Sequence, residues 1–219
     1  MNKKKKKRYR SWPFIIGTLC IIAAVALFMS NRHEDAMAGK QAEALLQEIH
    51  EVIPTITEPA EHIFSGYKDS EVYIPDYILN PDMKMPEIEI DGNLYIGTLY
   101  FPALDLELPV MSSWSYPGLK VSPCLYAGSV YKGNAVIAAH NYESHFGRLS
   151  VLEPGDTVVF IDANGNVFNY EVIVQEVLAP TAIDAMLDND ADLSLFTCTI
   201  GGASRFTVRC RLLETPRLL

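Results

Sequence analysis

Basic residues are scarce in this chain beyond its first ten positions. Seven lysines and arginines lie within residues 1–10, whereas residues 33–219 contain only ten basic residues against 27 acidic ones. A protein that binds nucleic acid needs a patch or stripe of basic side chains to neutralise phosphates. The sequence therefore argues against nucleic acid as a partner, although the chain as a whole has a net charge of only −9.

Metal-binding motifs and internal repeats are also missing. The four cysteines form no Cys-x-x-Cys pair, the chain has no His-Glu-x-x-His, and no low-complexity tract occurs apart from the lysine run. Four residues could be imagined as zinc ligands: His140, Glu143, His145 and Cys198. Their spacing fits neither zinc pattern, so no metal site is predicted.

Charged residues are absent from residues 11–31, which are almost entirely apolar. At about 1.5 Å per residue this stretch reaches roughly 30 Å, enough to cross a membrane. The basic segment 1–10 predicts a cytoplasmic N-terminus and an extracellular remainder. A cleavable signal peptide ending near Ala36-Met37-Ala38 is the alternative, but its apolar core would span only about 7–15 residues. We therefore predict a retained single-pass signal anchor over residues 11–31.

Residues 32–89 are predicted to connect this anchor to a domain. Asp35 to Ile53 is rich in helix-forming residues and has apolar residues at helical spacing, which indicates a juxtamembrane helix acting as a loosely packed spacer. Pro54 would end this helix. Prolines then recur as far as Pro86 with little periodicity, which is typical of a linker or an extended wrap.

Residues 90–219 contain a series of short strand-like segments separated by turns. The expected strands are Leu94 to Phe101, Leu106 to Met111, Ala135 to Ala139, Thr157 to Asp162, Asn166 to Val177, Leu193 to Thr199 and a last strand from Arg205. Asn164-Gly165 predicts a two-residue hairpin turn. Many short strands with few long helical patterns indicate a closed or nearly closed all-β domain.

The last two expected strands flank a Gly201-Gly202 break, with Cys198 ending the first and Arg205 beginning the second. In the second strand, apolar and polar residues alternate, which predicts one buried face and one solvated face carrying its arginines. A permanently charged guanidinium near a cysteine can stabilise a thiolate. The alternative is a buried structural cysteine followed by a solvated basic edge strand.

A histidine at the end of another strand favours the catalytic interpretation. The apolar run from residue 134 to Ala139 ends at His140. A cysteine nucleophile needs a partner that protonates the leaving amine, and this partner is usually a histidine distant in sequence. His145 is a rival in the following loop, but His140 ends a buried strand, where a catalytic group would be held rigidly.

Together these segments resemble the sortases, the cysteine transpeptidases of Gram-positive cell surfaces. The family's Thr-x-x-Thr-Cys corresponds to Ser194 to Cys198, with serine in place of the first threonine. Its Arg-x-x-Val corresponds to Arg205 to Val208, and its histidine with a following Phe-Gly-Arg-Leu corresponds to His140 and residues 146–149. The resemblance covers Ile90 to Leu213 and keeps the order His, Cys, Arg.

The resemblance implies a mainly β fold, an eight-stranded sortase-type barrel with short helices in its loops, preceded by the N-terminal transmembrane helix. It implies that Cys198 cleaves an LPXTG-like sorting signal through a thioester. His140 would act as acid and base, and Arg205 would hold the substrate and the oxyanion. Arg209 and Arg211 are rivals for the arginine role, but only Arg205 matches the family motif.

The resemblance also implies partners and substrate contacts. The partners would be surface proteins bearing a sorting signal and an amine nucleophile such as a peptidoglycan precursor. Leu178 to Asp192 would form one wall of the substrate groove, and Ala139, Thr197 and Ile183 are assigned to substrate binding. No cofactor is expected; some sortases bind calcium, but no such site is identifiable here.

Several alternatives stay open at this point. A pilin-polymerising sortase is disfavoured because no second hydrophobic span follows Leu213, and a papain-type protease would have cysteine before histidine. A non-enzymatic cell-surface β module would use the same residues structurally. Pro75-Asp76-Tyr77 weakly resembles the lid of pilus-building sortases, although chance is the preferred explanation. Cys124 and Cys210 could pair or simply pack.

Overall fold

The computed structural model describes residues 12–53 and 75–213. The predictions for the basic segment 1–10, for the prolines between 54 and 74 and for the tail after Leu213 lie outside the described residues. The chain divides into two compact units, Met1–Met37 and Ala38–Leu219.

One helix, α1 (Trp12–Val52, 41 residues), begins in the first unit and ends in the second. The sequence predicted two separate segments here, but Arg32 to Asp35 between them contains neither proline nor glycine, so nothing breaks the backbone hydrogen-bond pattern. The side chains from Trp12 to residue 31 are exposed and mostly apolar. The helix is long and apolar enough to cross a membrane.

The part of α1 within the second unit packs closely on the barrel. Its buried residues recur every three or four positions: Ala38, Ala42, Leu45 and Ile49, followed by Ile53 just after the helix. Leu45, Ile49 and Ile53 share one apolar cluster with Tyr95 and Cys124. The prediction of a loosely packed spacer is therefore wrong, because the apolar stripe is buried against the barrel.

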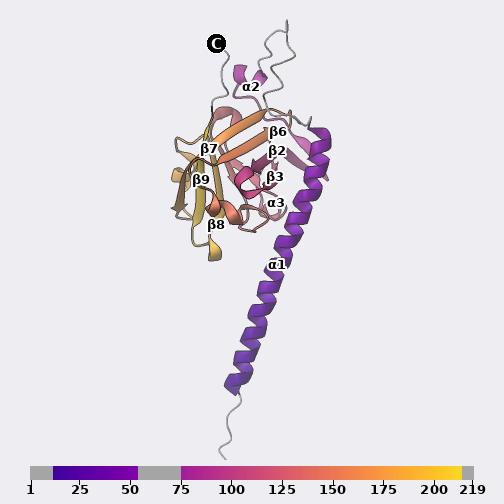
Figure 1. Cartoon of the computed structure of the whole chain (residues 1–219), viewed down its shortest axis with the longest axis vertical. Coiled ribbons are helices and arrows are strands. Elements are labelled where there is room, and N and C mark those ends of the chain that lie inside the picture. The colour runs from indigo at the N-terminus through magenta and orange to yellow at the C-terminus, as the bar shows by residue number, and fades with distance from the viewer. Residues whose placement is uncertain (1–11, 54–74, 214–219) are drawn as a thin grey trace, which may run out of the picture. The chain divides into compact units, whose positions relative to one another are not determined.

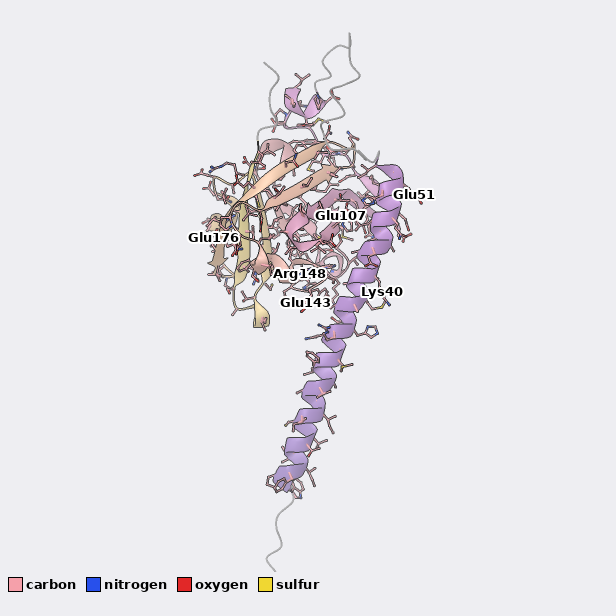
Figure 2. All side chains as sticks on the ribbon, viewed as in Figure 1. Lys40, Glu51, Glu107, Glu143, Arg148 and Glu176 are labelled. Carbon is pink, nitrogen blue, oxygen red and sulfur yellow. The ribbon has the colours of Figure 1, made fainter. Side chains whose placement is uncertain are left out.

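A polar contact flanks this packed stripe. His50 Nε2 lies 2.9 Å from Glu107 Oε1, which belongs to the barrel. Glu107 accordingly lies beside the last turns of α1 (Figure 2). Both side chains are solvent-accessible, so this pair contributes little stability compared with the buried stripe.

Nine strands make up the sheet of the described residues: β1 (Ile88–Ile90), β2 (Asn93–Phe101), β3 (Leu106–Met111), β4 (Cys124–Ala127), β5 (Ala135–Ala138), β6 (Thr157–Asp162), β7 (Val167–Leu178), β8 (Leu193–Cys198) and β9 (Arg205–Leu212). Their order is β1-β2-β3-β4-β5-β8-β9-β7-β6, and β6 pairs again with β2. Figure 1 shows β6 next to β2. Strands β2 to β9 therefore form a closed eight-stranded barrel, which confirms the predicted fold.

Strand β1 is an addition to this barrel. It pairs with the start of β2, where Ile90 faces Asn93, and β6 pairs with the following residues Gly97 to Tyr100. Both strands use the same edge of β2 in succession. The sequence did not predict β1 or β4, because three or four residues are too short for a recognisable alternation.

Short helices lie in the loops, as predicted: α2 (Asp76–Leu79), α3 (Tyr116–Leu119), α4 (Ile183–Leu187) and the 3-10 turns η1 (Pro102–Leu104), η2 (Val130–Lys132), η3 (Phe146–Val151) and η4 (Ile200–Gly202). The barrel interior is filled by aromatic and aliphatic side chains such as Leu99, Phe101, Phe160 and Leu195, which are fully buried. This packed interior provides the rigid frame on which the loops are mounted.

The turn between β6 and β7 differs from the prediction. The strands form a hairpin, but its loop contains four residues, 163–166, instead of two. The buried Asp162 carboxylate accepts hydrogen bonds from the backbone N–H groups of Asn164 and Asn166, both at 2.9 Å, and from the Tyr131 hydroxyl at 2.6 Å. This side-chain capping stabilises a wider turn.

Tyr77 does not lie at the end of the barrel where β5 leads to His140. Its ring stacks on Tyr131 with the centroids 4.7 Å apart and contacts Phe168 at 5.2 Å. Tyr131 precedes β5, whereas His140 follows it. This position agrees with the interpretation that the resemblance of residues 75–77 to a lid is a chance match.

Candidate active site

The site is organised by two parallel strands that are far apart in sequence. Strands β5 and β8 pair in parallel, with Ala138 opposite Phe196. His140 follows Ala138 by two residues, and Cys198 follows Phe196 by two. Because the carboxyl ends of parallel neighbours meet at one edge of a sheet, this register brings the histidine and the cysteine to the same end of the barrel.

Hydrogen bonds fix the two strand ends against each other. The Ala139 N–H donates to the Phe196 carbonyl at 3.1 Å, and the Thr197 hydroxyl donates to the Ala139 carbonyl at 2.9 Å. On the other side, the Phe146 N–H donates to the His140 carbonyl at 3.1 Å. The backbone that carries His140 is thus tied to β8 and to the loop that follows it.

Arg205 is brought to Cys198 by the next strand pair. β8 and β9 form an antiparallel hairpin in which Cys198 and Arg205 are directly opposite. The loop turns at Gly201 and Gly202, whose φ angles of +81° and +74° favour glycine. One guanidinium nitrogen of Arg205 donates to the carbonyls of Gly202 and Ser204, both at 3.2 Å.

The three candidate catalytic residues line one cavity of about 220 Å³. One wall comes from the loop between β7 and β8 and contributes Ala179, Pro180, Ala182, Ile183 and Met186. A second group of lining residues comes from the segment between β3 and β4 and from β4: Trp114, Tyr116, Leu119 and Tyr126. The result is a mainly apolar cleft with a thiol, an imidazole and a guanidinium at its border.

The aromatic wall was not predicted from the sequence. Trp114 contacts Tyr116 and Tyr126 with ring centroids 5.4 and 5.6 Å away, and Tyr126 meets Phe196 edge-on at 5.4 Å. These rings form a continuous row that reaches β8 two residues before Cys198. The available signal was the pair of large aromatic residues in a loop, where exposed rings indicate a binding surface.

The structure separates the predicted substrate-binding residues. Ala139 and Ile183 line the cavity, and Ile183 is 54% exposed. Thr197 is buried and does not line it; its hydroxyl joins β8 to Ala139 instead. Thr197 therefore joins the strand end that carries Cys198 to the segment that carries His140.

The rival residues lie elsewhere. His145 is buried and does not line the cavity; the ring of Tyr142 lies 4.9 Å from the His140 ring and 5.5 Å from the His145 ring. Arg209 is buried although the alternation placed it on a solvated face, and Arg211 is exposed opposite Glu171. Neither arginine lines the cavity.

All four cysteines are free thiols, so Cys124 and Cys210 do not pair. Both are fully buried, and burial disfavours the charged thiolate. Burial raises the pKa of the Cys124 thiol to about 11 and that of Cys210 to about 12.

We expect iodoacetamide to modify Cys198 before Cys124 and Cys210. At about pH 8 a thiol of pKa 11 is ionised to about one part in a thousand, and the reagent cannot reach a buried sulfur. Tryptic mass mapping of the full chain over time measures this selectivity, and the same mapping in urea provides the control in which all sites react. Modification of Cys124 or Cys210 as fast as Cys198 in the folded chain would contradict it.

Loss of the Thr197 hydroxyl is expected to loosen the site. Thr197→Val leaves the Ala139 carbonyl without this donor at nearly constant side-chain volume, at a cost of about 1–3 kcal/mol. Urea unfolding followed by tryptophan fluorescence measures this cost. Thr207→Val is the control, because among the described residues the buried Thr207 hydroxyl has no hydrogen-bond partner to lose. An equal or smaller loss for Thr197→Val would contradict the assignment.

Within residues 12–53 and 75–213, no group of three or more His, Cys, Asp or Glu side chains is placed to hold a metal ion. The candidate zinc ligands considered from the sequence therefore do not converge in this part of the chain. The absence of a cofactor stays a prediction.

Comparison with known proteins agrees with this architecture. The family profile of the sortase domain matches residues 99–213, which is more than half of the chain. The chain belongs to the sortase family. It is 27% identical to sortase A of Bacillus anthracis over 125 residues, which cover 54% of this chain and 59% of the length of that relative.

Solved structures share the fold. Sortase C of Clostridium perfringens, solved with the C-terminal cell wall sorting motif, is 24% identical with a TM-score of 0.50, and the match covers 67% of this chain and 80% of that one. Sortase C1 of Streptococcus agalactiae is 22% identical with a TM-score of 0.50, over 58% of this chain and 72% of that one. At these identities the likeness establishes the barrel.

Proposed function

We propose that this protein is a membrane-anchored sortase transpeptidase that cleaves an LPXTG-like sorting signal and transfers the surface protein to a cell-wall amine. The observation that carries this proposal is the meeting of Cys198, His140 and Arg205 at one cavity, at the shared end of β5, β8 and β9. A thiol nucleophile, an imidazole and a permanent cation are the groups that acyl transfer through a thioester requires.

In the first half of the reaction, the Cys198 thiolate attacks the carbonyl of the scissile peptide bond. Negative charge develops on the carbonyl oxygen, where the Arg205 guanidinium stabilises it. His140 gives its proton to the departing amine, the carbon–nitrogen bond breaks, and an acyl thioester to Cys198 remains.

In the second half, an amine enters the cleft and attacks the thioester carbonyl. His140 now accepts a proton from this amine, and the carbon–sulfur bond breaks to release the thiolate of Cys198 and the new amide. The mainly apolar walls limit the access of water to the thioester, which favours the amine over hydrolysis.

The N-terminal helix, which is long and apolar enough to cross a membrane, supports a membrane location for this reaction. We propose that α1 crosses the membrane with the basic segment 1–10 on the cytoplasmic side, so that the barrel faces the cell exterior. Surface proteins that carry a sorting signal and peptidoglycan precursors would be available to the barrel on that side of the membrane.

The test uses the full chain in detergent micelles and a library of fluorogenic pentapeptides, with and without added amines. Transfer of one motif to glycine or a diaminopimelate-type amine is the expected result. Transfer only to a lysine side chain would favour pilin polymerisation, and hydrolysis of unrelated peptides would favour a general protease. No reaction combined with an unreactive Cys198 would favour a non-enzymatic β module.

Removal of metal ions is expected to leave the transfer rate unchanged within about twofold, because the three proposed groups complete the reaction without a metal. The measurement is the initial rate of peptide transfer with EDTA and after re-addition of calcium. A rate that falls with EDTA and recovers with calcium would show that a cation acts in this protein.

A further inference from the structure

Arg209 is a buried cation that the reaction described above does not use. It lies on β9, four residues after Arg205, and is only 4% exposed. Its neighbour on β8 is Ser194, the residue opposite it in the antiparallel register. A guanidinium cannot lose its proton in a protein, so a buried one needs partners for its charge and its donors.

Four hydrogen bonds supply these partners. Nε donates to Glu176 Oε1 at 2.7 Å, and Nη1 donates to Ser194 Oγ at 2.7 Å. Nη1 also donates to the Met186 carbonyl at 3.1 Å, and Nη2 donates to the Ala185 carbonyl at 2.6 Å. The charge is thus matched by one carboxylate, and most N–H donors of the fork are satisfied.

These partners belong to three different elements. Glu176 is on β7, on the side of the domain formed by β7 and β9 (Figure 2), and Ser194 is on β8. The two carbonyls belong to the last turn of α4, where backbone oxygens lack partners within the helix. Arg209 therefore holds α4 to the barrel through the α4 backbone, without lining the cavity itself.

The same short helix forms part of the cavity wall. Ile183 and Met186 of α4 line the cavity together with Cys198. α4 has five residues and no side-chain cap at its N-terminus, so its own hydrogen bonds hold it weakly. Its position depends on contacts with the rest of the domain, and the guanidinium of Arg209 supplies two of them through the backbone.

We propose that Arg209 is a positioning residue for substrate recognition: it sets the place of the α4 wall and thereby the affinity for the sorting signal, without touching the reacting atoms. This proposal rests on the proposed function, since it takes the cavity as the substrate groove. The proposal predicts an effect mainly on KM, because His140 after β5, Cys198 at the end of β8 and Arg205 at the start of β9 keep their places.

The shape of the guanidinium explains why arginine is required. The planar guanidinium fork donates to Glu176, Ser194 and two carbonyls at once. A lysine ammonium is a single point of charge and cannot reach all four partners. Arg209→Lys therefore keeps the charge but loses the geometry. We expect this variant to raise KM, as Arg209→Met does. It should damage folding less, because a cation stays next to the half-buried Glu176 carboxylate.

The experiment compares Arg209→Lys, Arg209→Met and the control Arg211→Met in the full chain in detergent. Arg211 lies two residues further along β9 and is exposed. The expected result for both Arg209 variants is a KM for the peptide raised about tenfold or more with kcat within about threefold. Hydrogen exchange of the amides of residues 183–189 should accelerate, and the rate of Cys198 alkylation by iodoacetamide should stay within about twofold. Arg211→Met should change none of these.

Two results would overturn the proposal. Unchanged amide exchange in α4 of Arg209→Lys would show that Arg209 does not hold the wall. Faster exchange without a change in KM would show that the wall does not set affinity. If Arg209→Met fails to fold, Arg209→Lys and Ser194→Ala carry the same comparison.

Failure of the proposed function would look different. Wild-type protein that is alkylated at Cys198 yet transfers no peptide would contradict the transpeptidase assignment and the role of Arg209 in affinity with it. The exchange measurement would then still decide whether Arg209 fastens α4.

Discussion

Replacement of Cys198 by alanine is expected to abolish peptide transfer, with kcat/KM falling by about 10⁴-fold or more. The sulfur is the atom on which the acyl group is held between the two halves of the proposed reaction, and neither His140 nor Arg205 can replace it. The comparison of transfer rates for wild type and Cys198→Ala, with the fluorogenic peptide and its amine, measures this loss. Intact-mass spectra should show a peptide adduct on wild type and none on the variant.

The matched control is Cys20→Ala, which removes a thiol from the apolar part of α1. It should transfer peptide at the wild-type rate, because Cys20 belongs to the first unit and lines no part of the cavity. Cys198→Ser offers a second comparison: a hydroxyl is a much poorer nucleophile at neutral pH, so serine should not restore the rate. More than a tenth of the wild-type rate in Cys198→Ala would contradict the proposed covalent intermediate.

Gly97→Ala is expected to destabilise the barrel by more than about 4 kcal/mol or to prevent folding. Gly97 lies on β2 between Val110 of β3 and Asp162 of β6, with a φ of +147°. A Cβ there would lie 1.9 Å from the Ile161 carbonyl oxygen and 2.8 Å from the Asp162 Cα. Backbone atoms of the neighbouring strand cannot move aside without breaking the β2–β6 pairing, which closes the barrel.

Gly92→Ala is the control for this prediction. Gly92 has a φ of +73°, but a Cβ there would meet no atom within 4 Å, so only the backbone conformation would be strained. A cost of about 1–2 kcal/mol is expected. Urea unfolding of both full-length variants, followed by tryptophan fluorescence, separates a steric collision from conformational strain. Equal unfolding free energies for the two variants would contradict the close approach at Gly97.

Local patterns predicted most of the strands correctly. Thr157 to Asp162 forms β6 with the expected ends, and the run before His140 forms β5. Alternating or continuous apolar residues next to glycine or proline are sufficient for such predictions, because side chains of a strand point to opposite faces. The strands β1 and β4 were not predicted, because they are strands through their pairing with neighbouring strands and not through their composition.

The alternation in β9 was read correctly, but its exposure was not. Val208 and Cys210 face the barrel interior, as expected. Thr207 and Arg209 were placed on a solvated face and are nevertheless buried. Arg209 contacts the loop that carries α4. This loop covers the polar face of β9, so both faces of the strand are buried at this point although only one of them is apolar. Which loop covers an outer face depends on contacts that a local pattern does not contain.

For α1, too, the sequence predicted the helical pattern but not which residues are buried. The uncharged run 11–31 and the apolar positions after Asp35 predicted helix on both sides of the charged stretch. No proline or glycine separates these two segments, so they form one helix. Whether its second half is exposed or buried depends on the surface that the barrel offers. Tyr95 and Cys124 offer an apolar surface to Leu45 and Ile49, so the stripe is buried there.

By itself the sequence determined that a cysteine and a histidine each end an apolar strand and that an arginine begins the next strand after the cysteine. It also determined the proximity of Cys198 and Arg205, because a short glycine turn joins their strands. Only the tertiary structure decided that His140 joins them, since the β5–β8 pairing connects residues 58 positions apart. A parallel pairing of this kind is set by the closure of the whole barrel, and no short stretch of residues encodes it.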